Sequence, residues 1–261
     1  MTQVTITHIG GPTTLIEAGG WRLLTDPTFD PPGKRYSFGW GAMSRKLAGP
    51  AISADDLGPI DAVLLTHDQH GDNLDPAGRA LLPRFGRVLT TPQGARRVGG
   101  NVQGLAPWAT TTLQGKGREP IEITATPARH GPAGTRPLVG AVTGFALRWE
   151  GQEHGILWIS GDTVLYDGLR EVASRLDVGT AVLHLGGVRF PITGPMRYTM
   201  TAENAVELCG LLDPRTIVPV HYEGWAHFRE KQQKARQVFG ASPFASRVQW
   251  LDHGAAAKFE V

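Results

Sequence analysis

The segment Thr66–Asp75 reads THDQHGDNLD, which places two histidines and three aspartates within ten positions. It closes the apolar run Ala62–Thr66, which is typical of a buried strand that leads into a loop. A loop at the end of a rigid strand aims its side chains accurately. Histidine nitrogen and aspartate oxygen together suit zinc, manganese or iron. The segment therefore predicts part of a metal site; the alternative is a polar turn with two solvated histidines.

Three further predicted strands are each followed by a side chain that commonly binds metals. The pairs are His130 after Ile121–Thr126, Asp162 after Ile156–Ser160, and His221 after Thr216–Val220. A single histidine in such a place is more often structural, and Asp162 by itself would serve equally as a helix N-cap. Four such strand ends in one chain instead predict one site that is assembled from distant segments at the edge of a sheet.

The composition restricts what can hold the metal. The 261 residues include 26 Lys and Arg against 24 Asp and Glu, a net charge of +2 that leaves no electrostatic footprint for nucleic acid. A single cysteine excludes an internal disulfide and cysteine-rich zinc sites, which leaves carboxylates and the nine histidines. We find no signal-peptide pattern and no apolar run of about 20 residues, so we expect a cytoplasmic protein without a membrane span.

The remaining sequence predicts short strands first and alternating strands and helices later. The strands are Val4–Ile9, Thr14–Glu17, Trp21–Thr25, Val88–Thr90, Val142–Trp149, Ala181–Leu185, Val248–Leu251 and Ala256–Phe259. The helices are Ala77–Leu82, Gln93–Val98, Leu165–Leu176, one capped by Thr201, and Ala226–Phe239. We interpret Thr28–Pro59, rich in Gly and Pro, as a long surface loop. This pattern favours two packed sheets with outer helices in one domain, residues 1–261.

The order of the candidate ligands resembles the metallo-β-lactamase superfamily. Its motif is His-x-His-x-Asp-His, followed by a distant His, an Asp and a last His. The similar series in this sequence is His67, His70, Asp72, His130, Asp162 and His221. The stretches Leu24-Thr25-Asp26-Pro27 and Ala128-Arg129-His130 resemble the branch with the ascorbate-phosphate lactonase and the N-acyl-phosphatidylethanolamine phospholipase D. The resemblance implies an α/β fold, an αββα four-layer sandwich of two mixed sheets with helices on the outer faces.

The resemblance also implies a set of roles. His67, His70 and His130 would hold a first metal ion, Asp72 and His221 a second, and Asp162 would bridge the two ions. Asp72 and Asp162 would in addition be catalytic, since they could orient the attacking hydroxide or move its proton. We expect one or two divalent ions, zinc first, with manganese or iron as alternatives.

Two positions depart from the motif of the superfamily. Gln69 is an extra residue between the first two histidines, and Asn73 replaces the last one. Both are candidates for metal ligands or for residues that support ligands. Because an amide oxygen is a weaker zinc ligand than imidazole, we expect the second metal position to be weak, empty or filled by a harder ion such as manganese.

Several other residues are candidates for the walls of the substrate pocket. These candidates are His184, Arg189, Tyr198 and Tyr222; an arginine there would suit an anionic substrate. We expect His8 to be a packing residue. His227 falls on a predicted helix, and we expect it at the surface with His154 and His253.

These residues lead to one main functional hypothesis and two alternatives. The first is a hydrolase that uses a metal-bound hydroxide on a small ester, lactone or phosphoester. The second is a phosphodiesterase or nuclease of the same fold, although no nucleic-acid partner is expected. The third is a non-hydrolytic metal-binding protein whose site has degenerated at Gln69 and Asn73. Self-association into a homo-oligomer is left open.

Overall fold

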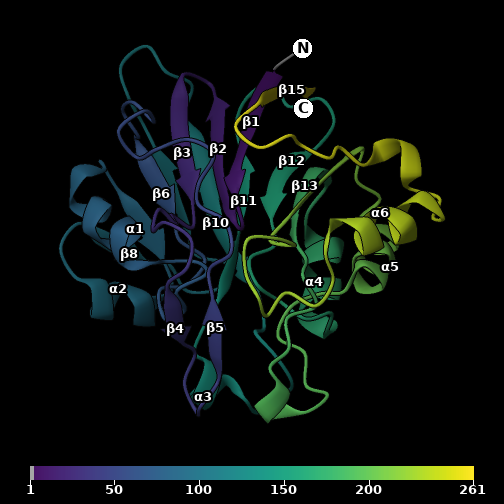
Figure 1. Ribbon diagram of the computed structural model, residues 1–261. Helices are drawn as coiled ribbons and strands as arrows, with labels where there is room; N and C mark the ends of the chain where they lie inside the picture. Colours follow the sequence, from purple (N-terminus) through teal and green to yellow (C-terminus); the bar gives the residue numbers. More distant parts are fainter. Residues whose placement is uncertain (1–2) are drawn as a thin grey trace.

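Two large mixed β-sheets pack face to face (Figure 1), and the computed structural model describes residues 3–261. The first sheet has seven strands, in the order β15 (Ala256–Glu260), β1 (Gln3–Gly10), β2 (Thr13–Ala18), β3 (Trp21–Thr25), β6 (Ala62–Leu64), β7 (Val88–Thr90) and β8 (Val102–Gly104). Its first four strands are antiparallel, and the pairs from β3 to β8 are parallel.

The second sheet has six strands. Their order is β14 (Thr216–Val220), β13 (Val178–His184), β12 (Ile156–Ile159), β11 (Thr143–Arg148), β10 (Ile121–Pro127) and β9 (Thr110–Leu113). The pairs β12–β13 and β13–β14 are parallel, and the others are antiparallel. Parallel neighbours place their carboxyl ends at the same sheet edge, which is where β12 and β14 are followed by Asp162 and His221.

Apolar side chains between the two sheets form the main core. Ile6, Ile16 and Leu23 from the first sheet pack with Phe145 and Leu157 from the second, and all five are fully buried. These residues alternate along their strands with residues that face outward, as expected for a strand with one face on the core. The sandwich is thereby a rigid support for the loops at its end.

Helices cover the outer faces of the two sheets. They are α1 (Pro76–Leu81) and α2 (Pro92–Val98) beside the first sheet, α4 (Asp167–Arg175), α5 (Ala202–Leu212) and α6 (Gln232–Gly240) beside the second, and α3 (Arg136–Val139) at one end; Leu82–Arg84, Pro191–Thr193 and Ala245–Arg247 form 3-10 turns. Leu169 and Leu208 pack on the outer side of Trp158. The predicted αββα arrangement with two mixed sheets is confirmed. No helix among residues 3–261 is both long and apolar enough to cross a bilayer.

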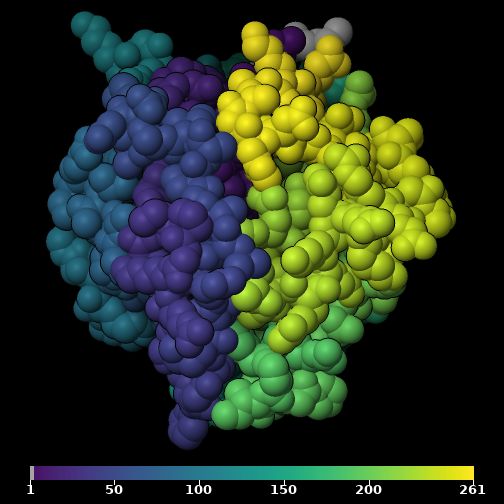
Figure 2. All heavy atoms as spheres, viewed as in Figure 1, coloured from purple at the N-terminus to yellow at the C-terminus, as the bar shows by residue number. Residues whose placement is uncertain are grey.

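Three predicted elements are wrong. The segment Thr28–Pro59 contains a two-stranded ribbon of β4 (Arg35–Ser37) and β5 (Met43–Arg45), which projects from the sandwich (Figures 1 and 2). Residues 248–251 form one bridge and no strand. The last long helix begins at Gln232, because Trp225, His227 and Phe228 turn their side chains inward instead. The apolar residues there mimic a helical period without forming a helix.

Candidate metal centre

The loops that follow β6, β10, β12 and β14 bring their candidate ligands together at one end of the sandwich. Six side chains form two compact groups, His67 with His70 and His130, and Asp72 with Asp162 and His221. Within each group the ligand atoms all lie within 4.8 Å of one another, and all six residues are buried. The sequence therefore located both groups, although they join segments up to about 150 residues apart.

The first group presents three histidine nitrogens to a common point. His67 Nε2 lies 3.2 Å from His70 Nδ1, and His130 Nε2 lies 3.0 Å from the same atom. The other ring nitrogens are fixed by the surrounding chain: His130 Nδ1–H donates to the Tyr198 carbonyl at 2.8 Å, and His67 Nδ1–H donates to Thr66 Oγ1 at 3.1 Å. These bonds leave Nε2 of His67 and Nε2 of His130 free to act as ligands.

Burial keeps these rings neutral. It lowers the pKa of His130 to about 3, with a further contribution from His70, and holds the pKa of His67 well below its usual range. The pKa of His70 is also lowered by burial. A metal ion binds only the neutral form of imidazole, so this group is ready for metal at neutral pH.

The second group combines two carboxylates with one histidine. His221 Nε2 lies 3.4 Å from Asp162 Oδ2 and 3.5 Å from Asp72 Oδ2, while His221 Nδ1–H donates to the Leu185 carbonyl at 3.2 Å. Although burial opposes the charged ring, Asp162 and Asp72 raise the pKa of His221 to about 9. Burial raises the pKa of Asp162 to about 6. The two carboxylates therefore concentrate negative charge in a buried place.

Unsatisfied atoms in this group fit a cation. Both carboxylate oxygens of Asp162, Oδ1 of Asp72 and Nε2 of His221 are buried without a hydrogen-bond partner in the part of the chain that the structure describes. Buried polar atoms without partners are rare and costly, and a bound ion satisfies several of them at once. Nitrogen and carboxylate donors are also the usual ligands of a divalent transition metal. The residues present therefore fit the metal that this donor set implies.

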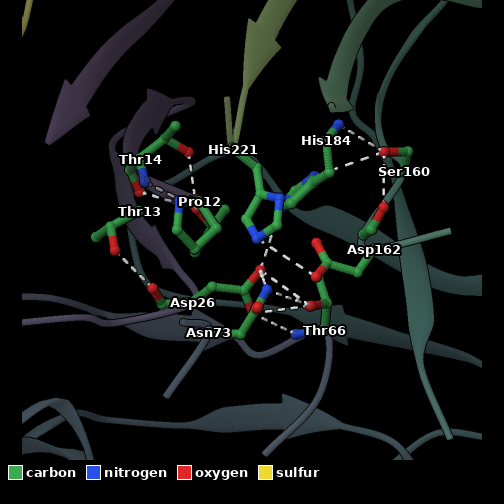
Figure 3. Close-up of polar contacts among 12 residues, drawn as sticks. Pro12, Thr13, Thr14, Asp26, Thr66, Asn73, Ser160, Asp162, His184 and His221 are labelled. Atoms are coloured by element: carbon green, nitrogen blue, oxygen red, sulfur yellow. Dashed lines mark hydrogen bonds and ion pairs between the residues drawn. The ribbon is translucent and has the colours of Figure 1, made fainter. Parts of the chain in front are cut away.

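Asp26 lies close to His221 of the second group (Figure 3) and was not among the predicted site residues. It follows β3 and accepts hydrogen bonds from the Thr66 backbone N–H at 2.7 Å, from the Thr66 hydroxyl, and from Asn73 Nδ2 at 3.3 Å. Its Oδ2 also lies 3.3 Å from His184 Nε2. Burial raises the pKa of Asp26 to about 7. The Asp-Pro turn signal was present in the sequence, but a turn does not reveal a contact 40 residues away.

The two departures from the motif lie in different places. Asn73 is buried beside Asp26, and its Oδ1 has no partner within residues 3–261. Gln69 points away from both groups: its Nε2 donates to the carbonyls of Val139 (3.1 Å) and Ala141 (3.0 Å). The extra residue of the motif thus ties the loop to the segment around α3.

His227 was predicted to lie at the surface, and this prediction is wrong: the residue is buried against the second group. Its Nε2 lies 2.8 Å from Asp72 Oδ2, and its Nδ1 lies 2.6 Å from Ser44 Oγ in β5. The helical prediction placed it outward, whereas the non-helical segment after Trp225 turns it inward. No sequence pattern distinguished it from a surface histidine, because its partners lie 155 and 183 residues away.

A cavity of about 260 Å³ opens beside the two groups. His70, Asp72, His130 and His227 form its polar end, and its walls are mainly apolar, including Phe38, Leu138, Phe190, Ile192 and Met196. Among the residues that the structure describes, no lysine or arginine lines it. Tyr198 is on its wall, as expected. His184, Arg189 and Tyr222 are not: His184 is buried beside Asp26, Arg189 is exposed, and Tyr222 packs against Trp250.

Metal-free protein is expected to lose stability as the pH falls below about 6.5, the pKa of histidine in an unfolded chain. Burial lowers the pKa of His8 to about 4 and that of His130 and His184 to about 3. The unfolded chain therefore binds protons that the native state excludes, and stability falls progressively between about pH 6.5 and pH 3. The measurement is the Tm of chelator-treated protein across this range.

Other groups change the size of this effect without reversing it. The six buried histidines with a lowered pKa are His8, His67, His70, His130, His184 and His227. Asp26 and Asp162, whose pKa values are raised, act in the opposite direction below pH 7. The contribution of His221 is present below pH 6.5 and is lost as the pH rises through about 9. A Tm that stays constant between about pH 7 and pH 5 would contradict the prediction.

Comparison with known proteins gives a consistent result. Residues 21–222 match the model of a family described as the beta-lactamase superfamily domain. A UPF0173 metal-dependent hydrolase of Pyrococcus furiosus is 24% identical over 243 residues, which cover 91% of this chain and 93% of the relative. The isothiocyanate hydrolase from Delia radicum gut bacteria has a TM-score of 0.81 at 20% identity and covers 98% of this chain and 100% of that chain. A possible metal-dependent hydrolase from Veillonella parvula has a TM-score of 0.80 at 20% identity, with 98% and 99% covered.

Proposed function

The chain belongs to the beta-lactamase superfamily domain family and is a metal-dependent hydrolase of that fold, and from this premise we propose that its two ligand groups form one two-metal active site. His67, His70 and His130 hold one ion, and Asp72, Asp162 and His221 hold the other. The observation that carries the proposal is the set of buried, unpartnered atoms on Asp72, Asp162 and His221. Zinc is the first candidate for both ions, and manganese or iron for the group with two carboxylates.

The protein side chains then have separate roles. When bound, divalent ions lower the pKa of a water molecule from about 15.7 to about 7 and stabilise developing negative charge on the substrate. Asp72 borders the cavity and, with Asp162, orients the attacking water by accepting its hydrogen bonds. His227 holds one oxygen of Asp72, which leaves Oδ1 for other partners.

The cavity favours a neutral substrate with an apolar part. Apart from the metal ligands at its polar end, its walls are mainly apolar and carry, among the described residues, no lysine or arginine that could pair with a charged part of the substrate. An ester or a lactone fits this environment better than a phosphoester, because the charge of a phosphoester would have partners only at the metal site and none along the walls, and a charged group buried without a partner is costly. We therefore propose hydrolysis of a small apolar ester or lactone and place the phosphoester, and with it the phosphodiesterase and nuclease alternative, second.

A substrate panel tests the reaction. Zinc-loaded and manganese-loaded protein is assayed with neutral esters, lactones and a phosphodiester, and with an isothiocyanate, the substrate class named for one structural neighbour. We expect turnover of neutral substrates and little or none of the phosphodiester. Preference for the phosphodiester would contradict the proposed substrate class, and no turnover with any metal would contradict the proposed reaction.

Introducing a charge into the cavity wall should weaken binding of apolar substrates. Ile192 lines the cavity and its side chain is largely exposed, so Ile192→Glu should leave the fold intact. We expect KM for an apolar ester to rise about tenfold with kcat little changed, since one apolar contact is worth about 1–3 kcal/mol. Leu211→Glu, at an exposed leucine outside the cavity, is the control. An unchanged KM in Ile192→Glu would show that the substrate does not use this wall.

Removing His227 should reduce catalysis while the metal stays bound. Without its 2.8 Å contact, Asp72 loses the group that fixes its orientation, and losses of this kind cost about 10–100-fold in activity or affinity. His227→Gln should recover part of the activity of His227→Ala, because an amide can donate to the same oxygen. The readouts are kcat and metal content; equal kcat in wild type and His227→Ala would rule out this role.

A further inference from the structure

A third group of ligand-type side chains lies outside the proposed active site. It consists of His8 in β1, Glu223 just after β14 and His253 just before β15. One ligand atom from each lies within 4.8 Å of the other two. The group therefore joins three segments that are distant in the sequence, and the reaction proposed above uses none of its members.

His8, a member of this group, has a ring nitrogen without a hydrogen-bond partner among the described residues. The ring is fully buried, and its Nε2–H donates to the Gly11 carbonyl at 2.9 Å, which leaves the lone pair on Nδ1. That Nδ1 has no hydrogen-bond partner among residues 3–261. A buried acceptor without a partner costs about 1–3 kcal/mol. A ligand bound at Nδ1 would remove this cost.

The other two members lie between His8 and solvent. His253 Nε2 is 2.5 Å from Glu223 Oε1, and the rings of His8 and His253 are 4.7 Å apart between centroids. Glu223 and His253 also line a small cavity of about 80 Å³. This space exceeds the roughly 30 Å³ that one water occupies, so a metal ion with a water ligand has room beside Glu223 and His253.

We propose that His8, Glu223 and His253 form a separate, structural site for a divalent transition metal. Two imidazoles and one carboxylate match the donor set of zinc, and the open side toward the cavity leaves a position for water as the fourth ligand. Small movements suffice, because the ligand atoms already lie within 4.8 Å of one another. The bound ion gives His8 Nδ1 the partner that it otherwise lacks.

An ion at this site would link the two sheets. It ties β1 of the first sheet to the segment that follows β14 of the second sheet. The Gly11 carbonyl that accepts from His8 also accepts from the His221 backbone N–H at 2.8 Å. A metal on His8 Nδ1 therefore anchors the loop that carries His221, although it does not take part in the reaction.

Zinc binding to full-length variants tests the proposal. Wild type and a His253→Ala variant are equilibrated with zinc, dialysed and analysed for metal content; His253 is partly exposed, so its replacement should not disturb folding. We expect His253→Ala to hold one zinc fewer than wild type and to lose part of the zinc-induced rise in Tm. His154→Ala, at a histidine outside all three groups, should behave as wild type.

A second pair of variants separates this site from the active site. A protein with His67→Ala and Asp162→Ala should retain one zinc, and adding His253→Ala to it should remove that zinc. If His253→Ala and Glu223→Gln both bind as much zinc as wild type, the group is only an ion pair beside a neutral histidine and the proposal is wrong. If the His67→Ala, Asp162→Ala protein retains its one zinc but wild type shows no hydrolysis, the proposed function fails and this site stands.

Discussion

The Asp162→Ala variant is expected to lose metal from the active site and to hydrolyse its substrate about 1,000-fold more slowly. Both carboxylate oxygens of Asp162 are buried without a hydrogen-bond partner in the described residues, and Oδ2 lies 3.4 Å from His221 Nε2. Metal ions contribute several kcal/mol to stabilising charge in a transition state, and each 1.36 kcal/mol is a factor of ten in rate. The measurements are elemental analysis and kcat with the best substrate of the panel.

An aspartate in the same region provides the matched control. Asp167, at the start of α4, is fully exposed, and Asp167→Ala should change neither metal content nor kcat. The Asp162→Ala protein should keep the circular dichroism of wild type, since Asp162 lies in the loop after β12 and outside every helix and strand. Metal content equal to that of wild type in Asp162→Ala would rule out the metal-binding role of this residue.

The Asp75→Ala variant is expected to be strongly destabilised, by about 3–5 kcal/mol. Asp75 pairs with Lys46 at 2.8 Å, and only 3% of the Lys46 side chain and none of the Asp75 side chain is exposed. The same carboxylate accepts backbone N–H groups of Phe29 and Asp30 and caps α1 at Gly78. Its removal leaves a buried ammonium group and three N–H donors without partners. The Tm should fall by on the order of 10 °C.

A rescue experiment identifies the cause of this loss. Adding Lys46→Met to Asp75→Ala removes the unpaired charge. It should restore part of the lost stability, because the buried position of Lys46 can accommodate an apolar side chain. Asp55→Ala, at an exposed aspartate with a 3.7 Å contact to Arg84, should have little effect on Tm. A Tm for Asp75→Ala within about 2 °C of wild type would show that the pair is not needed for stability.

The sequence was informative where a pattern is local. Periodicity identified most strands and helices, and the rule that ligands follow strand ends located His130, Asp162 and His221. The pattern of elements also favoured two packed sheets, and family resemblance then supplied their αββα order, which the structure confirms. That residues 1–261 form a single domain stays a prediction, as do the metal roles of the six ligand-type residues.

The sequence was not informative where a contact joins distant segments without a pattern. His227 reaches Asp72 and Ser44 because a short stretch after Trp225 is not helical, and propensity favoured a helix there. Asp26 supports Thr66 and Asn73 through side-chain hydrogen bonds that no periodicity reveals. The cavity is apolar because the turn between β4 and β5, helix α3 and residues 188–196 contribute apolar side chains to its walls, and a predicted loop carries no information on that packing.

The central claim is that one active site holds two metal ions on six named side chains. Crystals of zinc-loaded protein, measured at wavelengths on both sides of the zinc absorption edge, locate each ion directly. We expect one anomalous peak about 2.0–2.1 Å from His67 Nε2, His70 Nδ1 and His130 Nε2, and a second among Asp72, Asp162 and His221. Hydrolytically active protein with no peak at either group would contradict the account.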